Sequence, residues 1–171
     1  MDRAFLFAAR AHKNQRYGDK PYSTHLESVM ACCAELGFSS TAHLVVAALH
    51  DVLEDTAEDP RAMESRFGRD TVDAVRQLTR KSGTLLADYF GEMGPLAFAV
   101  KIADRISNLR RHGREPSFRR RQREHLFPKY ESEQTRFRTH RLAKHPAFAP
   151  AIAKLEAELQ AARTRLFGQP S

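Results

Sequence analysis

The sequence predicts an all-α fold, and three observations support this prediction. Apolar residues recur at helical spacing along most of the 171 residues. No run alternates between apolar and polar residues as a half-exposed strand would. Glycines and prolines stand mainly between the periodic segments, where they would separate helices. With 42% hydrophobic and 29% charged residues, the composition is typical of a globular protein, and we expect one domain over residues 1–171.

The N-terminal part predicts two helices joined by a polar loop. Residues 4–13 carry apolar side chains on one face, and residues 14–23 form a polar stretch without periodicity. Thr24 can cap a second helix over residues 24–35, which Gly37 can end. This part of the chain is therefore expected to be helix, loop, helix.

A third helix over residues 42–49 is predicted to lie in the core, because it is apolar on most sides. The Ser-Ser-Thr sequence of residues 39–41 offers capping side chains before it. His50 and Asp51 follow at its C-terminal end. Neighbouring side chains of an ideal helix point in different directions, so these two can reach one ion only where the helix ends or bends.

The remaining helices are predicted from the same periodicity. They span residues 60–67, 70–79, 86–111 and 151–167, and the basic residues 119–141 form one or two further helices. Pro60 suits the first turn of its helix, whereas Pro95 is expected to break the helix over residues 86–111. Loops are expected at residues 81–84 and 113–117, and a frayed end at residues 169–171.

The later part of the helix over residues 86–111 has two faces. The apolar face carries Ala99, Ile102, Ile106 and Leu109. The polar face carries Lys101, Asp104 and Asn108, at positions i, i+3 and i+7. This helix can therefore pack through one face and present polar side chains on the other.

The charge is unevenly distributed along the chain. The net charge is +7, whereas residues 101–145 alone carry +9 and the remainder carries −2. The basic segment over residues 110–144, within the helical C-terminal part 112–171, can attract nucleic acid or a highly phosphorylated small ligand. It can equally be a solvated helical face, and composition alone leaves both interpretations open.

Nothing in the sequence indicates a membrane or a secreted protein. No apolar run approaches the roughly 20 residues needed to span a bilayer, and the first residues lack a signal-peptide pattern. Cys32 and Cys33 are the only cysteines, and neighbours in a helix are poor partners for a disulfide. We therefore expect reduced cysteines, a cytoplasmic location and no membrane partner. The sequence does not define the oligomeric state.

Four candidate metal ligands lie far apart in the sequence: His25, the doublet His50-Asp51, and Asp104. Buried carboxylates are costly unless paired or bound to metal, and Asp51 follows an apolar helix. Imidazole and carboxylate ligands suit Mn²⁺, Fe²⁺ or Zn²⁺, and four protein ligands leave positions for water and substrate. Each residue alone has an ordinary alternative, such as a capping histidine or a salt bridge between Asp104 and Arg105. The joint pattern is what predicts a site.

Glu54 and Asp55 lie one turn beyond His50 and indicate acid/base chemistry beside the metal. The alternative is an exposed helix end. Together with the ligands, this acidic pair predicts a metal-dependent phosphohydrolase. Structural roles are expected for the other histidines, which are His12, His43, His112, His125, His140 and His145.

These residues occur in an order that resembles the (p)ppGpp hydrolase group of HD-domain proteins. The most specific motif is matched by Ala47-Ala48-Leu49-His50-Asp51-Val52-Leu53-Glu54-Asp55-Thr56. The opening motif is matched by Ala11-His12, Gln15-Arg16, Pro21-Tyr22 and His25. Later motifs are matched by Phe67-Gly68, Leu78-Thr79, Pro95-Leu96-Ala97, Val100-Lys101-Ile102-Ala103-Asp104-Arg105 and Asn108-Leu109. The resemblance covers about residues 4–111 and is to a small alarmone hydrolase, the hydrolase half of the RelA/SpoT enzymes.

This resemblance implies an HD-domain helical bundle in which Mn²⁺ is the usual metal. The implied metal ligands are His25, His50, Asp51 and Asp104. Glu54 and Asp55 would act on the attacking water and the leaving group.

The resemblance also implies a nucleotide site. Its candidate residues are Arg16, Tyr17, Lys101, Arg105 and Asn108. Arg16 matches a residue that packs on the guanine base, and Asn108 matches one that contacts the nucleotide. The chain departs from the family at Tyr17, where members commonly have Lys, and at Leu26, where they commonly have Pro. We expect Tyr17 to offer a second aromatic surface to the base.

The expected activity is hydrolysis of ppGpp and pppGpp to GDP or GTP and pyrophosphate. Two alternatives remain open. Because Tyr17 removes a positive charge near the substrate, the enzyme could act on another nucleotide, such as a nucleoside monophosphate or NADPH. A non-catalytic nucleic-acid-binding protein would bind in a salt-sensitive way without turnover. The presence of both the His-Asp and the Glu-Asp pair argues against that second alternative.

Overall fold

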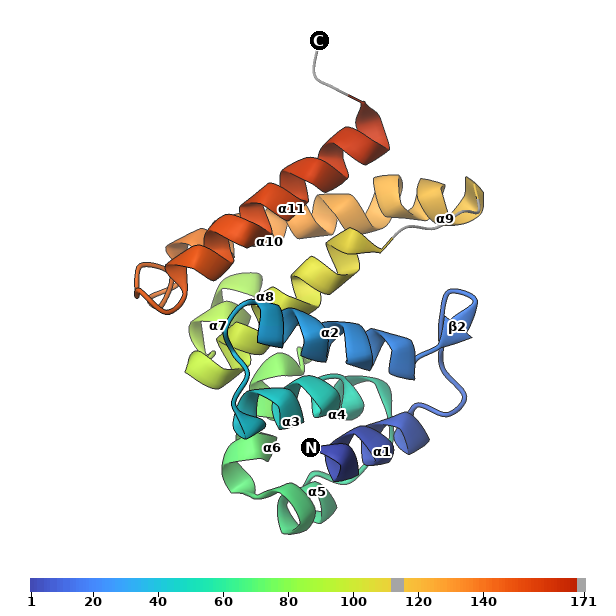
Figure 1. Cartoon of the computed structure of the whole chain (residues 1–171), viewed down its shortest axis with the longest axis vertical. Coiled ribbons are helices and arrows are strands. Elements are labelled where there is room, and N and C mark those ends of the chain that lie inside the picture. Colours follow the sequence, from blue (N-terminus) through green and yellow to red (C-terminus); the bar gives the residue numbers. More distant parts are fainter. Residues whose placement is uncertain (112–115, 169–171) are drawn as a thin grey trace.

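Helices make up most of the structure, which confirms the all-α prediction (Figure 1). The computed structural model describes residues 1–111 and 116–168. The helices of the first half are α1 (Asp2–Ala11), α2 (Ser23–Glu35), α3 (Thr41–Leu49), α4 (Val52–Asp55), α5 (Pro60–Phe67) and α6 (Arg69–Leu78). Those of the second half are α7 (Leu86–Gly91), α8 (Pro95–Arg110), α9 (Pro116–Arg121), the π-helical turn η1 (Gln122–Leu126), α10 (Phe127–Thr139) and α11 (Ala149–Phe167).

The loop expected between α1 and α2 contains a short antiparallel hairpin, which the sequence did not predict. Strand β1 (Arg16–Tyr17) pairs with β2 (Lys20–Pro21). Strands of two residues are too short to show alternation of apolar and polar side chains. At the turn, Gly18 has a φ of 69°, a left-handed conformation that glycine adopts without steric cost. The hairpin fixes Arg16 and Tyr17 beside the start of α2.

Helix α8 is the central element of the fold. It packs against α2, α3, α6 and α11, and Figure 1 shows it passing between α2 and the C-terminal helices. It begins at Pro95, which confirms the expected break from α7. The predicted apolar face is buried throughout, at Ala99, Ile102, Ile106 and Leu109. Side chains on different sides of α8 can therefore contact both halves of the chain.

The C-terminal half of helix α3 lies in the core, with Val46, Ala47, Ala48 and Leu49 buried, and it ends where the site residues begin. Ser40 caps it, because the Ser40 hydroxyl accepts a hydrogen bond of 3.4 Å from the backbone N–H of His43. The helix ends at Leu49, and a bend at His50 and Asp51 separates it from α4. Asp51 has φ −102° and ψ −2°, outside regular helical values. This bend lets two neighbouring side chains point the same way.

The C-terminal helices close one side of the bundle. Helices α10 and α11 pack against each other, and α11 also packs on α8. Phe98 of α8 stacks on His140 with a centroid distance of 4.0 Å, and it lies against Phe137 and Phe148. His140 thus has the structural role predicted for it. The one or two helices expected over residues 119–141 are instead three consecutive segments, α9, η1 and α10.

Two sequence-based expectations fall at the edges of the described chain. Residues 113–115 of the loop expected over 113–117 lie outside the described residues, whereas α9 already begins at Pro116. Residues 169–171, expected to fray, also lie outside them. Cys32 and Cys33 are both buried and free, as predicted.

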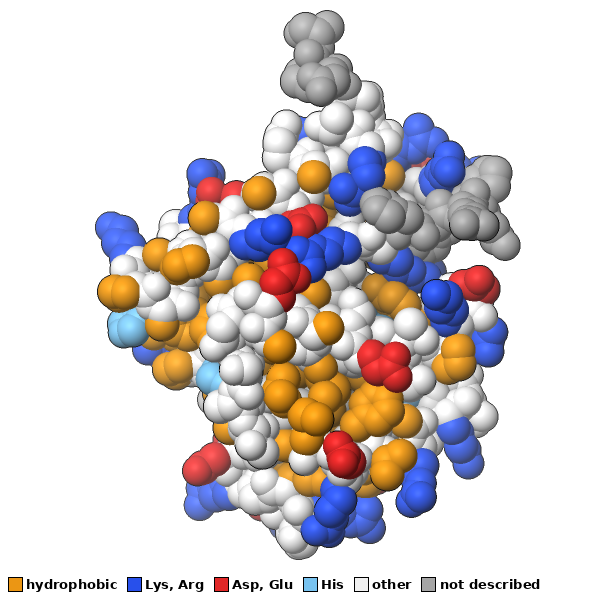
Figure 2. Space-filling model, in the orientation of Figure 1, with side chains coloured by type: hydrophobic (Ala, Val, Ile, Leu, Met, Phe, Trp, Pro, Cys, Tyr) orange, Lys and Arg blue, Asp and Glu red, His pale blue; other side chains and the backbone are white. Residues whose placement is uncertain are grey.

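The surface includes an apolar area over the N-terminal helices. Figure 2 shows hydrophobic side chains gathered on this face, with acidic and basic side chains around them. Between α1 and α2, a groove is lined by Met1, Phe5, Leu6 and Met30 together with Asp2 and Glu27. None of the predicted site residues lines it. No helix in the described parts of the chain combines the length and apolar character that crossing a membrane requires.

Candidate active site

The four candidate metal ligands come together in the structure. His25 lies in the first turn of α2, His50 and Asp51 form the bend after α3, and Asp104 lies on the polar face of α8. His25 Nε2 is 3.4 Å from Asp104 Oδ1 and 3.6 Å from Asp51 Oδ2. His50 Nε2 is 2.8 Å from Asp51 Oδ2 and 3.9 Å from Asp104 Oδ1. Ligand atoms of His25, His50 and Asp51 all lie within 4.8 Å of one another, close enough to share one metal ion.

The ligands are oriented by hydrogen bonds from outside the cluster. His50 Nδ1 lies 2.8 Å from the carbonyl oxygen of Ala47, so Nδ1 carries the proton and Nε2 keeps its lone pair for a metal. The Tyr22 hydroxyl donates a hydrogen bond to Asp51 Oδ2. Asn108 Nδ2 donates to Asp104 Oδ1 at 2.6 Å. Support of this kind fixes the ligand atoms before an ion binds.

The electrostatics of the cluster fit a bound cation. Burial alone would lower the pKa of His25, but hydrogen bonds to Asp104 and Asp51 outweigh it and raise this pKa to about 9. Burial would raise the pKa of Asp51, yet the His50 and His25 imidazoles hold it well below its usual range. Without a metal, protonated His25 supplies positive charge to the two buried carboxylates, and a divalent cation would supply that charge in its place.

The buried polar atoms point to the same conclusion. Among the residues that the structure describes, His50 Nε2 is buried and has no hydrogen-bond partner. The close approach of His50 Nε2 to Asp51 therefore lacks the geometry of a hydrogen bond, and a ligand bond to a metal would satisfy this nitrogen. Two imidazoles and two carboxylates form a donor set for a divalent transition metal. The residues present therefore fit a divalent metal site.

Lys101 lies beside the cluster, on the same face of α8. Its Nζ is 3.4 Å from Asp104 Oδ2 and 5.7 Å from the centroid of the Tyr89 ring. Burial would lower the pKa of Lys101, but Asp104 and Tyr89 raise it. The ammonium group therefore stays charged and holds Asp104 ionised.

Arg105, a predicted substrate-binding residue, points away from the cluster. It is 3% exposed, and its guanidinium pairs with Glu133 of α10. The guanidinium carbon also lies 4.0 Å from the centroid of the Tyr130 ring. Neighbouring residues of a helix project about 100° apart, so Asp104 and Arg105 face different partners. The structure therefore gives Arg105 a role in packing α8 on α10, not a place at the metal ligands.

Glu54 and Asp55 lie on α4, directly after the bend that carries His50 and Asp51. Both side chains are solvent accessible. Surrounding protein nevertheless desolvates Glu54 and raises its pKa, an effect that Asp51 and Asp55 reinforce and that Lys101 opposes. The acidic pair is thus at the mouth of the site, where it can contact both water and substrate.

Arg16 and Tyr17 lie on the hairpin beside His25. Arg16 is exposed, and its guanidinium donates to the carbonyl oxygen of Asp19. Tyr17 stacks on His25 with a centroid distance of 4.6 Å, and the guanidinium carbon of Arg111 lies 3.7 Å from the Tyr17 ring centroid. Both faces of the Tyr17 ring are therefore covered. The aromatic surface expected to stack on a base is occupied by the protein itself.

Asn108 is also engaged within the site. Its Oδ1 accepts a hydrogen bond of 3.0 Å from the Tyr17 hydroxyl, while its Nδ2 donates to Asp104. Asn108 therefore links the hairpin to a metal ligand and supports the cluster. The direct nucleotide contact expected for it would have to use the remaining lone pair of Oδ1.

The comparisons with known proteins agree with this geometry. Residues 4–84 match the HD domain family. This stretch is therefore similar to an HD domain. The match extends over α1 to α6 and includes His25, His50, Asp51, Glu54 and Asp55. Asp104 lies outside the match, and α8 brings it to the same cluster.

Curated relatives confirm the predicted resemblance to the RelA/SpoT group. The chain is 37% identical over 123 residues to a probable GTP pyrophosphokinase of Mycobacterium leprae, covering 64% of this chain and 15% of the relative. It is 34% identical over 115 residues to guanosine-3′,5′-bis(diphosphate) 3′-pyrophosphohydrolase MESH1 of Xenopus tropicalis, covering 61% and 64%. The bifunctional (p)ppGpp synthase/hydrolase SpoT of Escherichia coli K12 is 32% identical over 136 residues, covering 71% and 19%. The chain thus spans less than two thirds of the length of each of these relatives.

A solved structure extends the shared fold beyond residues 4–84. It is described as a metazoan ortholog of SpoT that hydrolyzes ppGpp and plays a role in starvation responses. The TM-score is 0.74 at 22% identity, and the match covers 98% of this chain and 96% of the other. The C-terminal helices are therefore part of the same fold.

Sequence reasoning missed three residues at the HD-domain site. Tyr22 contacts the ligand Asp51, Gln15 donates a hydrogen bond of 2.8 Å to Asp55 Oδ2, and Arg111 lies on Tyr17. Gln15 and Tyr22 belong to the opening motif, but the motif alone does not reveal which distant residue each contacts. Nothing in the sequence marks Arg111 among the other arginines of the basic segment.

Proposed function

We propose that this protein is an Mn²⁺-dependent 3′-pyrophosphohydrolase of ppGpp and pppGpp. The cluster of His25, His50, Asp51 and Asp104, with Glu54 and Asp55 at its mouth, is the observation that carries this proposal. The MESH1 relative is a guanosine-3′,5′-bis(diphosphate) 3′-pyrophosphohydrolase and the SpoT relative is a (p)ppGpp synthase/hydrolase, which supports the substrate. The mixed nitrogen and oxygen donors suit Mn²⁺.

The reaction would transfer the 3′-diphosphate to water. The water oxygen attacks the phosphorus that is bound to the ribose 3′ oxygen. The bond between this phosphorus and the 3′ oxygen breaks, so GDP or GTP leaves and pyrophosphate is the second product. When bound, the metal polarises a phosphoryl oxygen and lowers the pKa of water. A proton must leave the water and another must reach the 3′ oxygen.

The acidic pair has distinct parts in this scheme. Gln15 holds Asp55 through Oδ2, which leaves Oδ1 to orient the attacking water. Desolvation raises the pKa of Glu54, and a carboxyl group with a raised pKa exchanges protons more readily near neutral pH. We therefore assign proton transfer to Glu54 and the positioning of water to Asp55.

The nucleotide would bind across the hairpin and the end of α8. Arg16 is exposed and can stack its guanidinium plane on a guanine. Asn108 and Tyr17 support Asp104 and His25 from behind. Lys101, which stays charged, can attract the 3′-diphosphate.

We infer that residues 1–171 act as one catalytic domain in the cytoplasm. The pairing of Arg105 with Glu133 and the packing of α11 on α8 support a single unit. Free, buried Cys32 and Cys33 suit a reducing compartment. A nucleotide substrate is also available there.

The paired arginines of the basic segment argue against a nucleic-acid-binding function. Arg110 lies 2.6 Å from Glu35 and 2.8 Å from Glu158, and Arg138 lies 2.6 Å from Glu156. Charges neutralised within the protein release few counterions on binding to nucleic acid. We therefore favour a small phosphorylated ligand.

A nucleotide panel tests the proposed function. Purified protein is stripped of metal, reloaded with Mn²⁺, Mg²⁺ or Zn²⁺, and incubated with ppGpp, pppGpp, nucleoside monophosphates and NADPH. We expect GDP or GTP and pyrophosphate from the first two substrates, with Mn²⁺ the most active metal. Turnover of only NADPH or a monophosphate overturns the substrate, and full turnover in excess chelator overturns the metal dependence.

Two variants link that activity to the cluster. Asp104→Asn should reduce both metal content and turnover, because it removes a charged ligand. The matched control is His125→Ala, which changes an exposed histidine of η1 and should leave both unchanged. Elemental analysis measures the metal independently of activity.

A further inference from the structure

Arg111 follows the last residue of α8 and lies on the ring of Tyr17. Its guanidinium carbon is 3.7 Å from the ring centroid, whereas the His25 ring lies 4.6 Å away at an interplanar angle of 25°. Two groups at stacking distance cannot share one face of a ring, so Tyr17 lies between the guanidinium and the imidazole. One aromatic ring thus separates the Arg111 charge from a candidate metal ligand.

The hairpin forms a cradle for this guanidinium. A Cβ atom on Gly18 would lie only 2.7 Å from a terminal nitrogen of Arg111, so the glycine leaves the space that the guanidinium occupies. The Tyr17 hydroxyl donates to Asn108, which fixes the ring beneath Arg111. Tyr17, Gly18 and Asn108 therefore set the position of Arg111.

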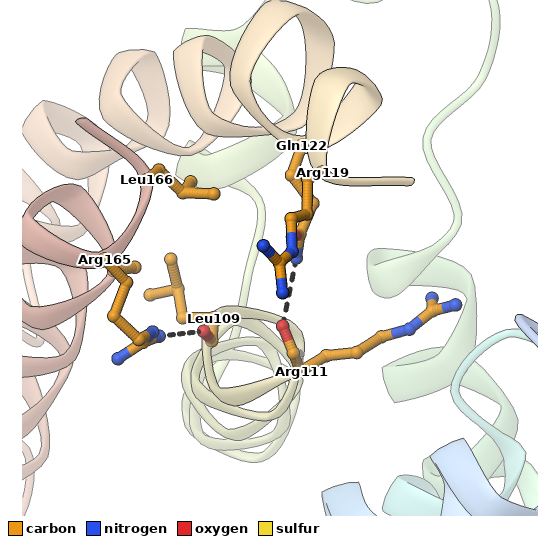
Figure 3. A pocket seen from close by; sticks show the side chains of 7 residues that line it. Leu109, Arg111, Arg119, Gln122, Arg165 and Leu166 are labelled. Carbon is orange, nitrogen blue, oxygen red and sulfur yellow. Dashed lines mark hydrogen bonds between the residues drawn. The ribbon is translucent and has the colours of Figure 1, made fainter. Parts of the chain in front are cut away.

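The hollow between α8, α9 and α11 is lined by arginines, but it suits an anion less well than the cradle at the hairpin does. Arg165 donates a hydrogen bond of 2.7 Å to the Leu109 carbonyl, and Gln122 donates one of 3.0 Å to the Arg111 carbonyl (Figure 3). These carbonyls belong to the negative C-terminal end of α8, which disfavours anions. Figure 3 shows the Arg111 side chain extended away from Arg165 and Leu166. The Arg111 charge is therefore directed out of the hollow, toward Tyr17.

We propose that Arg111 binds the 5′-phosphates of the guanosine nucleotide and supplies, from the end of α8, the positive charge that this chain lacks at Tyr17. This inference rests on the proposed function. If the 3′-diphosphate binds at the candidate metal ligands, the 5′-phosphates lie on the other side of the ribose. The ribose ring is of similar width to the Tyr17 ring, and the Tyr17 ring separates His25 from Arg111. Arg111 is therefore placed to reach the 5′-phosphates. A guanidinium can bind phosphate oxygens through two parallel hydrogen bonds. Arg111 is thus a specificity-determining residue.

Kinetics with two substrates test this role. The values of kcat/KM are measured for ppGpp and for guanosine 3′-diphosphate, which lacks the 5′-phosphates. The ratio of interest is kcat/KM for ppGpp divided by kcat/KM for guanosine 3′-diphosphate. We expect Arg111→Ala to lower this ratio by roughly 10- to 100-fold, mainly through a higher KM for ppGpp, because a charge-assisted contact is lost. Arg111→Lys should lower the ratio less, since it keeps the charge but not the stacking plane.

Two glycine variants provide a matched comparison. Gly18→Ala should lower the ratio as well, because its Cβ would displace the guanidinium. Gly68→Ala is the control: Gly68 also has a positive φ, of 85°, but nothing lies within 4 Å of its Cβ position. It should change the melting temperature without changing the ratio.

The outcomes separate this inference from the proposed function. If wild-type protein hydrolyses both substrates, and both Arg111→Ala and Arg111→Lys leave the ratio unchanged, Arg111 only packs on Tyr17 and the inference is overturned. If wild-type protein hydrolyses neither guanosine nucleotide, the proposed function is overturned and this inference with it. Metal content, measured in each variant, should be unaffected.

Discussion

Gln15 Nε2 donates a hydrogen bond of 2.8 Å to Oδ2 of Asp55, a residue 40 positions further along the chain. On the other side of the same amide, Gln15 Oε1 lies 2.7 Å from Nδ1 of His12. Nδ1 must therefore carry the proton, and the amide is held with its N–H groups toward Asp55. His12 is buried and stacks on Tyr22 at a centroid distance of 4.4 Å. The opening motif thus sets the orientation of one candidate catalytic carboxylate.

We expect Gln15→Ala to lower kcat for ppGpp by roughly 10-fold while KM and metal content stay near wild type, because Asp55 loses its orientation. Gln15→Glu should be worse than Gln15→Ala, since it places a second carboxylate against Asp55. Gln160→Ala, on the exposed surface of α11, is the control. Equal kcat values for all three variants would show that the hydrogen bond has no part in catalysis.

Removing the proton-transfer group should separate chemistry from metal binding. Glu54→Gln is expected to lower kcat by roughly 100-fold, the scale of general acid/base catalysis, without loss of fold or metal. Asp55→Asn should also lower kcat strongly. Glu92→Gln, another exposed glutamate, serves as the control. Steady-state kinetics and elemental analysis are the measurements, and near-normal turnover in both site variants would assign the pair a structural role.

The metal-free protein should lose stability as the pH rises. The pKa of His25 is raised to about 9 by Asp104 and Asp51 against the effect of burial, so protonated His25 stabilises the folded state. This stabilisation is fully present below the unfolded pKa of about 6.5 and is lost as the pH rises through the folded value, and it amounts to at most about 3 kcal/mol. Melting temperatures in excess chelator should therefore fall between pH 6.5 and 9.5.

Bound metal should abolish that pH dependence, because a metal ligand is already deprotonated. A His25→Gln variant in chelator should show a smaller decline than the wild type. A flat melting temperature for metal-free wild type across this range would contradict the coupling of His25 to the two carboxylates.

Arg16 is expected to contribute to binding and not to chemistry. Arg16→Ala should raise KM for ppGpp with little change in melting temperature, because the exposed guanidinium is lost as a surface for the base. Arg3→Ala on the exposed side of α1 is a control of equal charge. An unchanged KM in the Arg16 variant would remove Arg16 from the site.

The buried pair between Arg105 and Glu133 should dominate the stability of the C-terminal helices. Glu133→Gln leaves a buried guanidinium without its counter-charge, and we expect a loss of about 3–5 kcal/mol in the free energy of unfolding. Glu131→Gln breaks the more exposed pair with Arg163 and should cost about 1 kcal/mol or less. Chemical denaturation measures the free energy of unfolding of both variants. Equal losses in the two variants would show that burial of the Arg105–Glu133 pair is unimportant.

Much of the fold follows from periodicity in the sequence. The expected core helix over residues 42–49 and the helix over residues 60–67 correspond to α3 and α5 within one residue at each end. Pro95 separates α7 from α8 as expected, because proline suits the first turn of a helix but not its interior. The hairpin was missed because its pairing, Tyr17 with Lys20, is too short to leave a pattern.

The site was predictable where one element positions several residues and less so where distant elements meet. The helix end at His50 and Asp51 was expected from the sequence, and the structure places a bend there. Arg105 is a candidate substrate-binding residue because it lies in the same motif as Asp104 and Asn108, although adjacent helical residues face different directions. The stacking of Arg111 on Tyr17 depends on packing between a hairpin and a helix end, which no local pattern records.

Asp104 and Arg105 face different sides of α8, and this determines how short a fragment of the chain could be and still form the candidate metal site. Every motif of the resemblance lies before residue 112, which would suggest that residues 1–111 suffice. Yet the helix that delivers Asp104 also packs against α11, and its buried Arg105 pairs with Glu133 of α10. A chain that ends at residue 111 would expose to water the apolar and charged side chains of α8 that the C-terminal helices normally cover. The ion site would then be lost through aggregation or unfolding, although none of its ligands had been removed.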